Sequence, residues 1–211
     1  MSSPGRSWAC ALLVTVALTL GALAFGPAGA AVADPPEPTV VPADFGPSID
    51  PYAAYEGQRV CDPTPRSGVV DVRDLVLVVY GPRWTGIASG CGTARPSEHH
   101  DGRALDIAFD AHSERDRRLA EDFLGWLLAT DQYGNEHAMA RRLGVMYIIW
   151  NHHIWRSYEA YRGWQPYSGT PNPHTDHIHL SFSWDGALRR TTWWTAGPAA
   201  MSASRPPATD P

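Results

Sequence analysis

The stretch from Ser97 to Asp110, SEHHDGRALDIAFD, ends in a regular alternation of apolar and polar residues. Leu105, Ile107 and Phe109 occupy every second position, which is typical of a β-strand with one buried face. Asp106 lies between two of these apolar residues and therefore points away from the core. The stretch predicts a strand that carries a carboxylate on its outer face.

A second stretch, residues 177–184 with the sequence HIHLSFSW, alternates more sharply. Its apolar residues fall on one face, so His177 and His179 share the other, polar face. A catalytic zinc ion needs about three nitrogen or oxygen ligands from the protein and an open position for water. Asp106 and His179, on the outer faces of two strands, would supply two of these ligands.

The third ligand is expected just before the turn at Gly102, where His99 and His100 are neighbours. The strand pattern is broken at Gly102, so periodicity does not choose between the two. His174 is a candidate to line the cleft. Four other histidines have no partner at ligand spacing and are expected in turns, on the surface or behind the ligands. They are His112, His137, His152 and His153.

The composition limits the possible partners. The chain has 211 residues and a formal net charge of −5. At about 100–200 residues per domain, this length leaves room for one domain with a sizeable core. The basic residues are all arginine, and the acidic balance offers no electrostatic footprint for nucleic acid. We therefore expect no nucleic-acid partner.

Residues 1–33 have the pattern of a signal peptide. Arg6 precedes an apolar run over residues 8–25. Small residues then offer cleavage after Ala30 or Ala33. A membrane anchor is the alternative, because the run approaches the length of a membrane span. The cleavage sites favour removal, which predicts a secreted protein with no stable membrane insertion afterwards.

Export also predicts a disulfide bond. Removal of the signal peptide takes away Cys10 and leaves Cys61 and Cys91 in an oxidising compartment, where thiols tend to pair. We therefore predict one bond between them. In the alternative, one of these cysteines joins the zinc site, but a set of histidine and aspartate ligands is complete without sulfur.

The rest of the pattern divides the chain. Residues 34–54 are rich in proline and predict an extended linker, residues 55–195 a folded domain, and residues 196–211 a disordered tail. Within the domain, residues 69–80 fit either a strand or a helix. The other expected elements are a helix capped by Ser113, a short helix over 135–143, a strand over 145–150 and a loop over 158–172.

The aromatic residues of that last loop have two interpretations. Tyr161, Trp164 and Tyr167 form a substrate wall beside the zinc site in one, and a satellite cluster under the loop in the other.

Two ordered motifs resemble those of a known family. The S-x-H-x-x-G-x-A-x-D and H-x-H motifs of the hedgehog/D-Ala-D-Ala zinc metallopeptidase family are matched by Ser97, His99, Gly102, Ala104 and Asp106, and by residues 177–179. The similarity extends roughly over residues 68–184. It implies an α+β fold in which a small antiparallel sheet carries the zinc site and packs against helices, and it favours a helix over residues 69–80.

The resemblance also implies roles for individual residues. His99, Asp106 and His179 would bind zinc. Asp176 would be the catalytic base, which requires a turn before the strand, around Thr175; as the alternative, Asp176 only forms the turn. His177 would steady the transition state or the substrate. Many members of the family hold the developing oxyanion with an arginine, for which Arg83 and Arg95 are candidates.

The implied function is that of a secreted, monomeric, zinc-dependent peptidase that hydrolyses peptidoglycan stem peptides, as a D-Ala-D-Ala carboxypeptidase or an endopeptidase. The competing interpretation is a zinc-stabilised module without turnover that binds the cell wall or a protein. A third class, a protein-interaction domain that uses the aromatic loop, would bind its partner without zinc.

Overall fold

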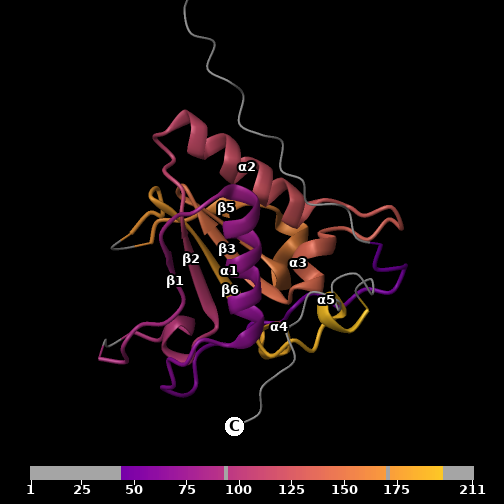
Figure 1. Ribbon diagram of the computed structural model, residues 1–211, viewed down its shortest axis with the longest axis horizontal. Coiled ribbons are helices and arrows are strands. Elements are labelled where there is room, and N and C mark those ends of the chain that lie inside the picture. Colours follow the sequence, from indigo (N-terminus) through magenta and orange to yellow (C-terminus); the bar gives the residue numbers. More distant parts are fainter. Residues whose placement is uncertain (1–43, 93–94, 170–171, 197–211) are drawn as a thin grey trace, which may run out of the picture. The chain divides into compact units, whose positions relative to one another are not determined.

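The computed structural model describes residues 44–92, 95–169 and 172–196. They form an α+β domain built on one antiparallel sheet of six strands in the order β1-β2-β6-β3-β4-β5 (Figure 1). The strands are β1 (Thr85–Gly86), β2 (Ala104–Ala108), β3 (Val145–Trp150), β4 (His153–Arg156), β5 (Gln165–Pro166) and β6 (His177–Phe182).

The last strand of the chain, β6, lies inside the sheet between β2 and β3. Both neighbours are antiparallel to it. Its side chains are buried from Ile178 to Phe182. The two segments with the clearest alternation, which are far apart in the sequence, are therefore hydrogen-bonded neighbours.

Helices cover one face of the sheet (Figure 1). They are α1 (Ser67–Tyr80), α2 (Glu114–Leu128), α3 (Ala138–Arg142), α4 (Trp184–Ala187) and α5 (Thr192–Thr195), and two 3₁₀ helices, η1 (Glu98–Asp101) and η2 (Ser157–Arg162), lie between strands. The core is formed where the apolar stripes of α1 and α2 meet the inward faces of β2, β3 and β6.

The ambiguous segment at residues 69–80 is helical. Val69, Val72 and Val76, at positions i, i+3 and i+7, are buried against the sheet. The helix ends at Gly81, whose φ of 80° is readily adopted by glycine, and Pro82 follows. The prediction of a helix here is confirmed.

The helix predicted after Ser113 is also confirmed. The Ser113 side chain accepts a hydrogen bond from the backbone N–H of Asp116, and Glu114 lies in the first turn. The buried stripe includes Leu119 and Phe123. This helix supports the core face of the sheet.

Three boundaries differ from the expected ones. The short helix starts at Ala138 because His137 has a φ of 52°, which is not helical. β6 stops at Phe182 because Ser183 caps α4. The expected loop at residues 158–172 contains η2 and the edge strand β5, which pairs with β4.

The N-terminal boundary of the domain also differs. A linker was expected up to residue 54, but residues 44–54 pack against the domain although they form no helix or strand. Phe45 is 6 % exposed and stacks on Trp193 at 5.2 Å. Arg142 donates hydrogen bonds to the carbonyl oxygens of Gly46 and Ser48. A proline-rich segment can be extended and still be anchored by one aromatic side chain and its carbonyl groups.

Cys61 and Cys91 form the predicted disulfide, with 5.9 Å between their Cα atoms. Since both sulfurs are used in this bond, neither cysteine is a metal ligand. The expected signal peptide at 1–33 and the tail from 197 lie outside the described residues. Among the residues that are described, no helix has the length and apolar character needed to cross a membrane.

Candidate metal centre

The register between β2 and β6 places Asp106 directly opposite His179. Side chains that face each other across an antiparallel pair point to the same side of the sheet. Asp106 Oδ1 consequently lies 2.8 Å from His179 Nδ1. The apolar residues that alternate with them face the helices, so this pair lies on the opposite face of the sheet.

His99 reaches the same place from η1. Ser97 caps this short helix by accepting a hydrogen bond from the N–H of His99. Gly102 ends it with a φ of 70°, and a Cβ there would lie 1.9 Å from the carbonyl oxygen of Thr64, so only glycine fits. The turn brings His99 Nε2 to 3.2 Å from Asp106 Oδ2.

The structure thereby decides between the two neighbouring histidines. The ring of His100 is buried away from Asp106, with its Nδ1 3.0 Å from Gln58 Oε1. His99, His179 and Asp106 each offer one ligand atom, and these atoms lie within 4.8 Å of one another. We call these three residues the metal triad. Such a group could bind a metal ion.

A hydrogen bond on the other side of the ring orients the imidazole of His99. Its Nδ1 lies 2.9 Å from the carbonyl oxygen of Ile87, which accepts hydrogen bonds only. Asp106 also accepts only, so the neutral ring can donate to one of its two partners; with the hydrogen on Nδ1, the lone pair of Nε2 is free to bind a metal. A ligating histidine that donates its other N–H to a carbonyl is the usual arrangement at metal sites.

The charges of the triad suit a cation. Burial favours a raised pKa for Asp106, but hydrogen bonds with His179 and His99 outweigh it and hold the pKa well below the usual value. Burial opposes protonation of His99, yet the contact with Asp106 raises its pKa above normal. For His179 burial prevails, and its pKa is lowered despite Asp106. The site therefore presents an ionised carboxylate between two imidazoles.

A model for the family described as VldE, C-terminal domain, matches residues 61–178 of the chain. The chain belongs to this family. The match begins at Cys61, covers His99 and Asp106, and ends one residue before His179. No curated protein and no solved structure was found to match. The description of the VldE C-terminal domain names a domain and not a reaction.

In this VldE C-terminal domain, Asp176 lies next to the triad but contacts it only through His177. His177 Nε2 is 3.6 Å from Asp106 Oδ1, and its Nδ1 is 2.8 Å from Asp176 Oδ1. The Asp176 side chain is 72 % exposed. Partial burial raises its pKa, but the bond with His177 outweighs this and the pKa is lowered. β6 starts at His177, so the chain turns at Asp176 as the sequence interpretation requires.

His174 lies beside the same rings. Its ring centroid is 4.7 Å from that of His177 and 5.7 Å from that of His179. Burial, followed by the nearby histidines, lowers its pKa to about 4, so the ring is neutral at pH 7. Asn172 accepts a hydrogen bond from the backbone N–H of His174 and holds the turn, in which His174 has a φ of 58°.

Three residues behind the triad were not assigned there from the sequence. Glu98 is 4 % exposed and accepts a hydrogen bond from the Tyr147 hydroxyl at 2.6 Å. Ser181 lies 2.9 Å from His179 Nε2. The alternation of residues 177–184 puts Ser181 on the same face as His177 and His179, whereas Tyr147 comes from β3 and its place required the sheet order.

One of the two arginines predicted to hold the oxyanion has a structural role. Arg83 donates to the carbonyl oxygens of Ala108 and Tyr80, and its guanidinium lies over the ring of Phe109, so it is held on the core side. This placement does not support the proposed oxyanion role. Asp101 is fully buried and paired with Arg103. Arg95 is exposed.

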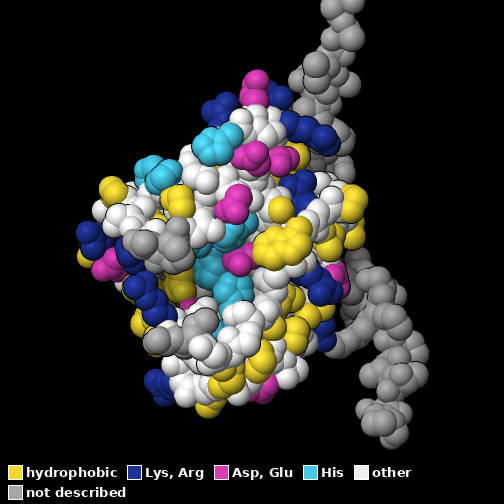
Figure 2. Space-filling view, turned by 90° about the vertical axis from the view of Figure 1, so that its left-hand side faces the viewer, with side chains coloured by type: hydrophobic (Ala, Val, Ile, Leu, Met, Phe, Trp, Pro, Cys, Tyr) yellow, Lys and Arg dark blue, Asp and Glu magenta, His cyan; other side chains and the backbone are white. Residues whose placement is uncertain are grey.

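Figure 2 shows a face of the molecule on which histidine side chains gather in a central hollow with acidic side chains among them. The aromatic loop contributes to both of its predicted environments. Tyr167 lies edge-on to His174 at 5.4 Å, whereas Trp164 packs against the core cluster. Only the first contact belongs to the metal side of the sheet.

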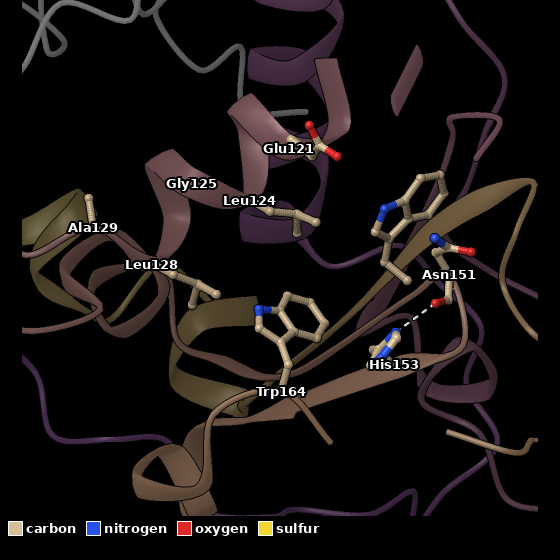
Figure 3. Close-up of a pocket in the computed structure, with 9 residues that line it drawn as sticks. Glu121, Leu124, Gly125, Leu128, Ala129, Asn151, His153 and Trp164 are labelled. Carbon is tan, nitrogen blue, oxygen red and sulfur yellow. Dashed lines mark hydrogen bonds between the residues drawn. The ribbon is translucent and has the colours of Figure 1, made fainter. Parts of the chain in front are cut away.

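A separate cavity of about 550 Å³ lies between α2 and the turn after β3. Figure 3 shows the indole of Trp164 facing Leu124 and Leu128 of α2, with His153 and Asn151 at the other end. No member of the metal triad lines it. The cavity is on the helix side of the sheet, because its Trp150 is out of phase with Ile149, the β3 partner of His179.

Proposed function

We propose that this member of the VldE C-terminal domain family is a secreted, monomeric zinc peptidase that hydrolyses peptidoglycan stem peptides. The observation that carries the proposal is the metal triad with the Asp176–His177 pair beside it. Two imidazoles and a carboxylate are a ligand set that catalytic zinc uses, with a fourth position left for water. The resemblance to hedgehog/D-Ala-D-Ala metallopeptidases supplies the substrate class.

In the proposed reaction, Asp176 and His177 have different roles. Bound zinc would lower the pKa of a water molecule to about 7 and polarise the scissile carbonyl. The carboxylate of Asp176 takes the proton of the attacking water and passes it to the leaving amine. Its lowered pKa keeps it ionised. His177 orients Asp176 through its Nδ1, and its Nε2 lies toward Asp106 of the triad, where it would steady the transition state or the substrate.

Purified protein loaded with zinc should release D-alanine or a cleaved cross-link from muropeptides, as detected by mass spectrometry. We expect Asp176→Asn to keep its zinc but to lose roughly 10²–10⁴-fold in rate, the usual scale of general acid–base catalysis. His179→Ala should lose both zinc and turnover. Near-normal cleavage by Asp176→Asn would reduce Asp176 to a turn residue.

One observation favours the second candidate, a zinc-stabilised binding module without turnover. Asp176 is largely exposed and is bonded to His177 rather than directed at the triad. In that case the zinc-loaded parent would cleave no stem peptide. It would still be retained on purified cell wall, and this retention would require zinc.

A further inference from the structure

The side chain of Trp84 lies on the metal face of the sheet, at its β1 edge. The Trp84 carbonyl accepts a hydrogen bond from the N–H of Ala108 and extends the β1–β2 ladder by one residue. Gly86 is the register partner of Asp106, so both point to the side of the metal triad. A Cβ at Gly86 would lie 3.1 Å from Cη2 of the Trp84 indole. The indole therefore lies over Gly86, one strand away from the triad.

The residues beside this indole are small. Ala108 lies opposite Trp84 on one side and is the register partner of His177 on the other. Neighbouring strands are about 4.8 Å apart, so Trp84 and His177 are separated by two such spacings, with the methyl group of Ala108 between them. Gly86 and Ala108 are both partly exposed, so solvent reaches this floor. We call Trp84, Gly86 and Ala108 the indole subsite.

The indole subsite presents an open apolar surface. Trp84 is 62 % exposed, so the face of its indole that is turned away from the strand is open. Figure 2 shows hydrophobic side chains beside the hollow in which the histidines gather. Contact with an indole buries a large apolar area, which is favourable in proportion to that area. The Gly86–Asp106 pair makes the subsite continuous with the triad. A residue next to one held at the metal therefore has its side chain against Trp84.

The end of the subsite that is farther from the triad carries a negative charge. Phe109 is fully buried in the core, so Asp110 points to the opposite side, which is the side of Ala108. Asp110 is exposed, and its Oδ1 accepts a hydrogen bond from the backbone N–H of His112, which orients the carboxylate. At about 3.3 Å per residue, Asp110 is roughly 13 Å along the chain from Asp106. A metal ligand, an apolar floor and an acid thus follow one another on this face.

We propose that Trp84 and Asp110 are specificity-determining residues that bind an unbranched aminoalkyl side chain, such as that of lysine. This side chain belongs to the substrate residue next to the one whose carbonyl is at the metal. Its methylene groups lie on the indole and on the methyl group of Ala108, and its ammonium group reaches Asp110. An ammonium group in this place is kept away from the metal cation, whose charge would repel it near Asp106. The inference rests on the proposed function and names the class of peptide that the site receives.

The probes are three synthetic peptides that end in D-Ala-D-Ala and carry lysine, norleucine or alanine directly before it. Each peptide has a fluorescent label at its N-terminus. Its dissociation constant for the zinc-loaded full chain is measured by fluorescence anisotropy on mixing, before hydrolysis proceeds. Mass spectrometry of the same samples at later times detects released D-alanine. Binding to the subsite and peptidase turnover are thereby measured separately.

The parent should distinguish the three peptides. We expect the norleucine and lysine peptides to bind roughly 10-fold more tightly than the alanine peptide, the lower end of the range for added methylene groups in an apolar site. The lysine peptide should bind roughly 2–5-fold more tightly than the norleucine peptide at low salt, because exposed ion pairs are weak. This further gain should vanish in about 1 M salt.

The variants separate the two contacts. Trp84→Ala should bring the norleucine peptide to the level of the alanine peptide, and Trp84→Phe, which keeps a ring, should preserve part of the difference. Asp110→Asn should remove only the advantage of lysine over norleucine. Ala108→Leu should weaken both long-chain peptides, because the larger side chain takes the space over the floor. Tyr133→Ala is the matched control, since Tyr133 is 44 % exposed in the loop between α2 and α3, and it should behave as the parent does. Every variant should keep the zinc content of the parent.

The outcomes distinguish the subsite from the peptidase function. Equal affinity of the three peptides for the parent would overturn the subsite, while release of D-alanine would leave the peptidase function standing. A preference that depends on Trp84, without release of D-alanine, would retain the subsite and count against turnover alone. A norleucine preference that survives Trp84→Ala, or a lysine advantage that survives Asp110→Asn, would overturn the role of that residue. A zinc-loaded parent that binds none of the peptides would overturn both proposals.

Discussion

Asp106 is the side chain on which the site converges. His99 and His179 each place a ring nitrogen within 3.2 Å of its carboxylate, and His177 is 3.6 Å away. A buried carboxylate whose neighbours are imidazoles stays ionised and can bind a cation. Each residue of the metal triad contributes one ligand atom, so its contribution to metal binding can be tested by a single substitution.

The first prediction concerns the ligands. We expect one zinc per chain in the parent, measured by elemental analysis after dialysis. His99→Ala and Asp106→Asn should lose the metal, because about three protein ligands are needed for a catalytic site. His100→Ala is the matched control, since its ring faces Gln58, and it should keep zinc. Loss of zinc from the His100 variant together with retention in the His99 variant would contradict the assignment.

The second prediction concerns pH and stability. Burial lowers the pKa of His137 below its ordinary 6.5, so the folded protein takes up this proton less readily than the unfolded chain. The contribution of a neutral His137 is therefore complete above about pH 6.5 and is lost as the pH falls below that value. In His137→Asn, which tolerates the positive φ of this position, the free energy of unfolding should fall less on acidification.

Urea unfolding of both proteins above and below pH 6.5 gives the measurement for His137. His153→Asn is the control, because His153 is exposed, and its pH dependence should equal that of the parent. An unchanged slope in the His137 variant would show that other groups cause the acid sensitivity.

His179 and His99 lie on two short elements, β6 and η1, which are held in place to different degrees. β6 is held on both sides by strands, so the orientation of His179 follows from the sheet. η1 has only four residues and depends on its surroundings. Ser89 N–H donates to the carbonyl of His99, Asp62 N–H donates to that of His100, and the disulfide joins the two supporting segments. The position of His99 is therefore set by the loops around η1.

The third prediction tests a helix on the opposite side of the sheet. Ser113→Ala removes the acceptor for the N–H of Asp116 at the start of α2, and should lower the free energy of unfolding by about 1 kcal/mol. Ser113→Asp keeps an acceptor and should retain the stability. Both variants should bind zinc like the parent, because α2 contributes no ligand. A Ser113→Ala variant as stable as the parent would show that the cap adds nothing measurable.

The domain as a unit includes its N-terminal segment. Arg142 is almost fully buried and connects three parts of the chain, since it donates to Gly46, Asp131 and Thr192. Phe45 fills the space beside Trp193 of α5. The contacts of Phe45 and Gly46 join residues that are more than 90 positions apart in the chain and make the segment from residue 44 part of the core.

The fourth prediction follows from this packing. Phe45→Ala leaves a cavity next to Trp193 and should lower the free energy of unfolding by about 3–5 kcal/mol in urea titrations. Val78→Ala is the control, because Val78 is 84 % exposed and its loss should cost less than about 0.5 kcal/mol. Equal stability of the two variants would return residues 44–54 to the role of a linker.

Much of the architecture could be predicted from local signals. Alternation identified the strands of Asp106 and His179, and the Ser113 cap identified α2. The linker boundary failed because proline content reports on chain stiffness and not on whether a side chain such as Phe45 finds a partner. Tyr147 was missed because the sequence does not show which strands are neighbours.

By itself, the sequence determined the periodic elements, the disulfide partners and the face on which Asp106 and His179 lie, because these depend on repeats and caps within a few residues or on a simple pairing of the two remaining cysteines. Periodicity did not choose between His99 and His100, and only the family resemblance pointed to His99; the tertiary structure brings His99 and not His100 to the other two residues. That choice depends on the Gly102 turn against Thr64 and on the carbonyl of Ile87, contacts that exist only after the strands have paired. Long-range register has no local signature, and it is the register that makes the separate motifs one site.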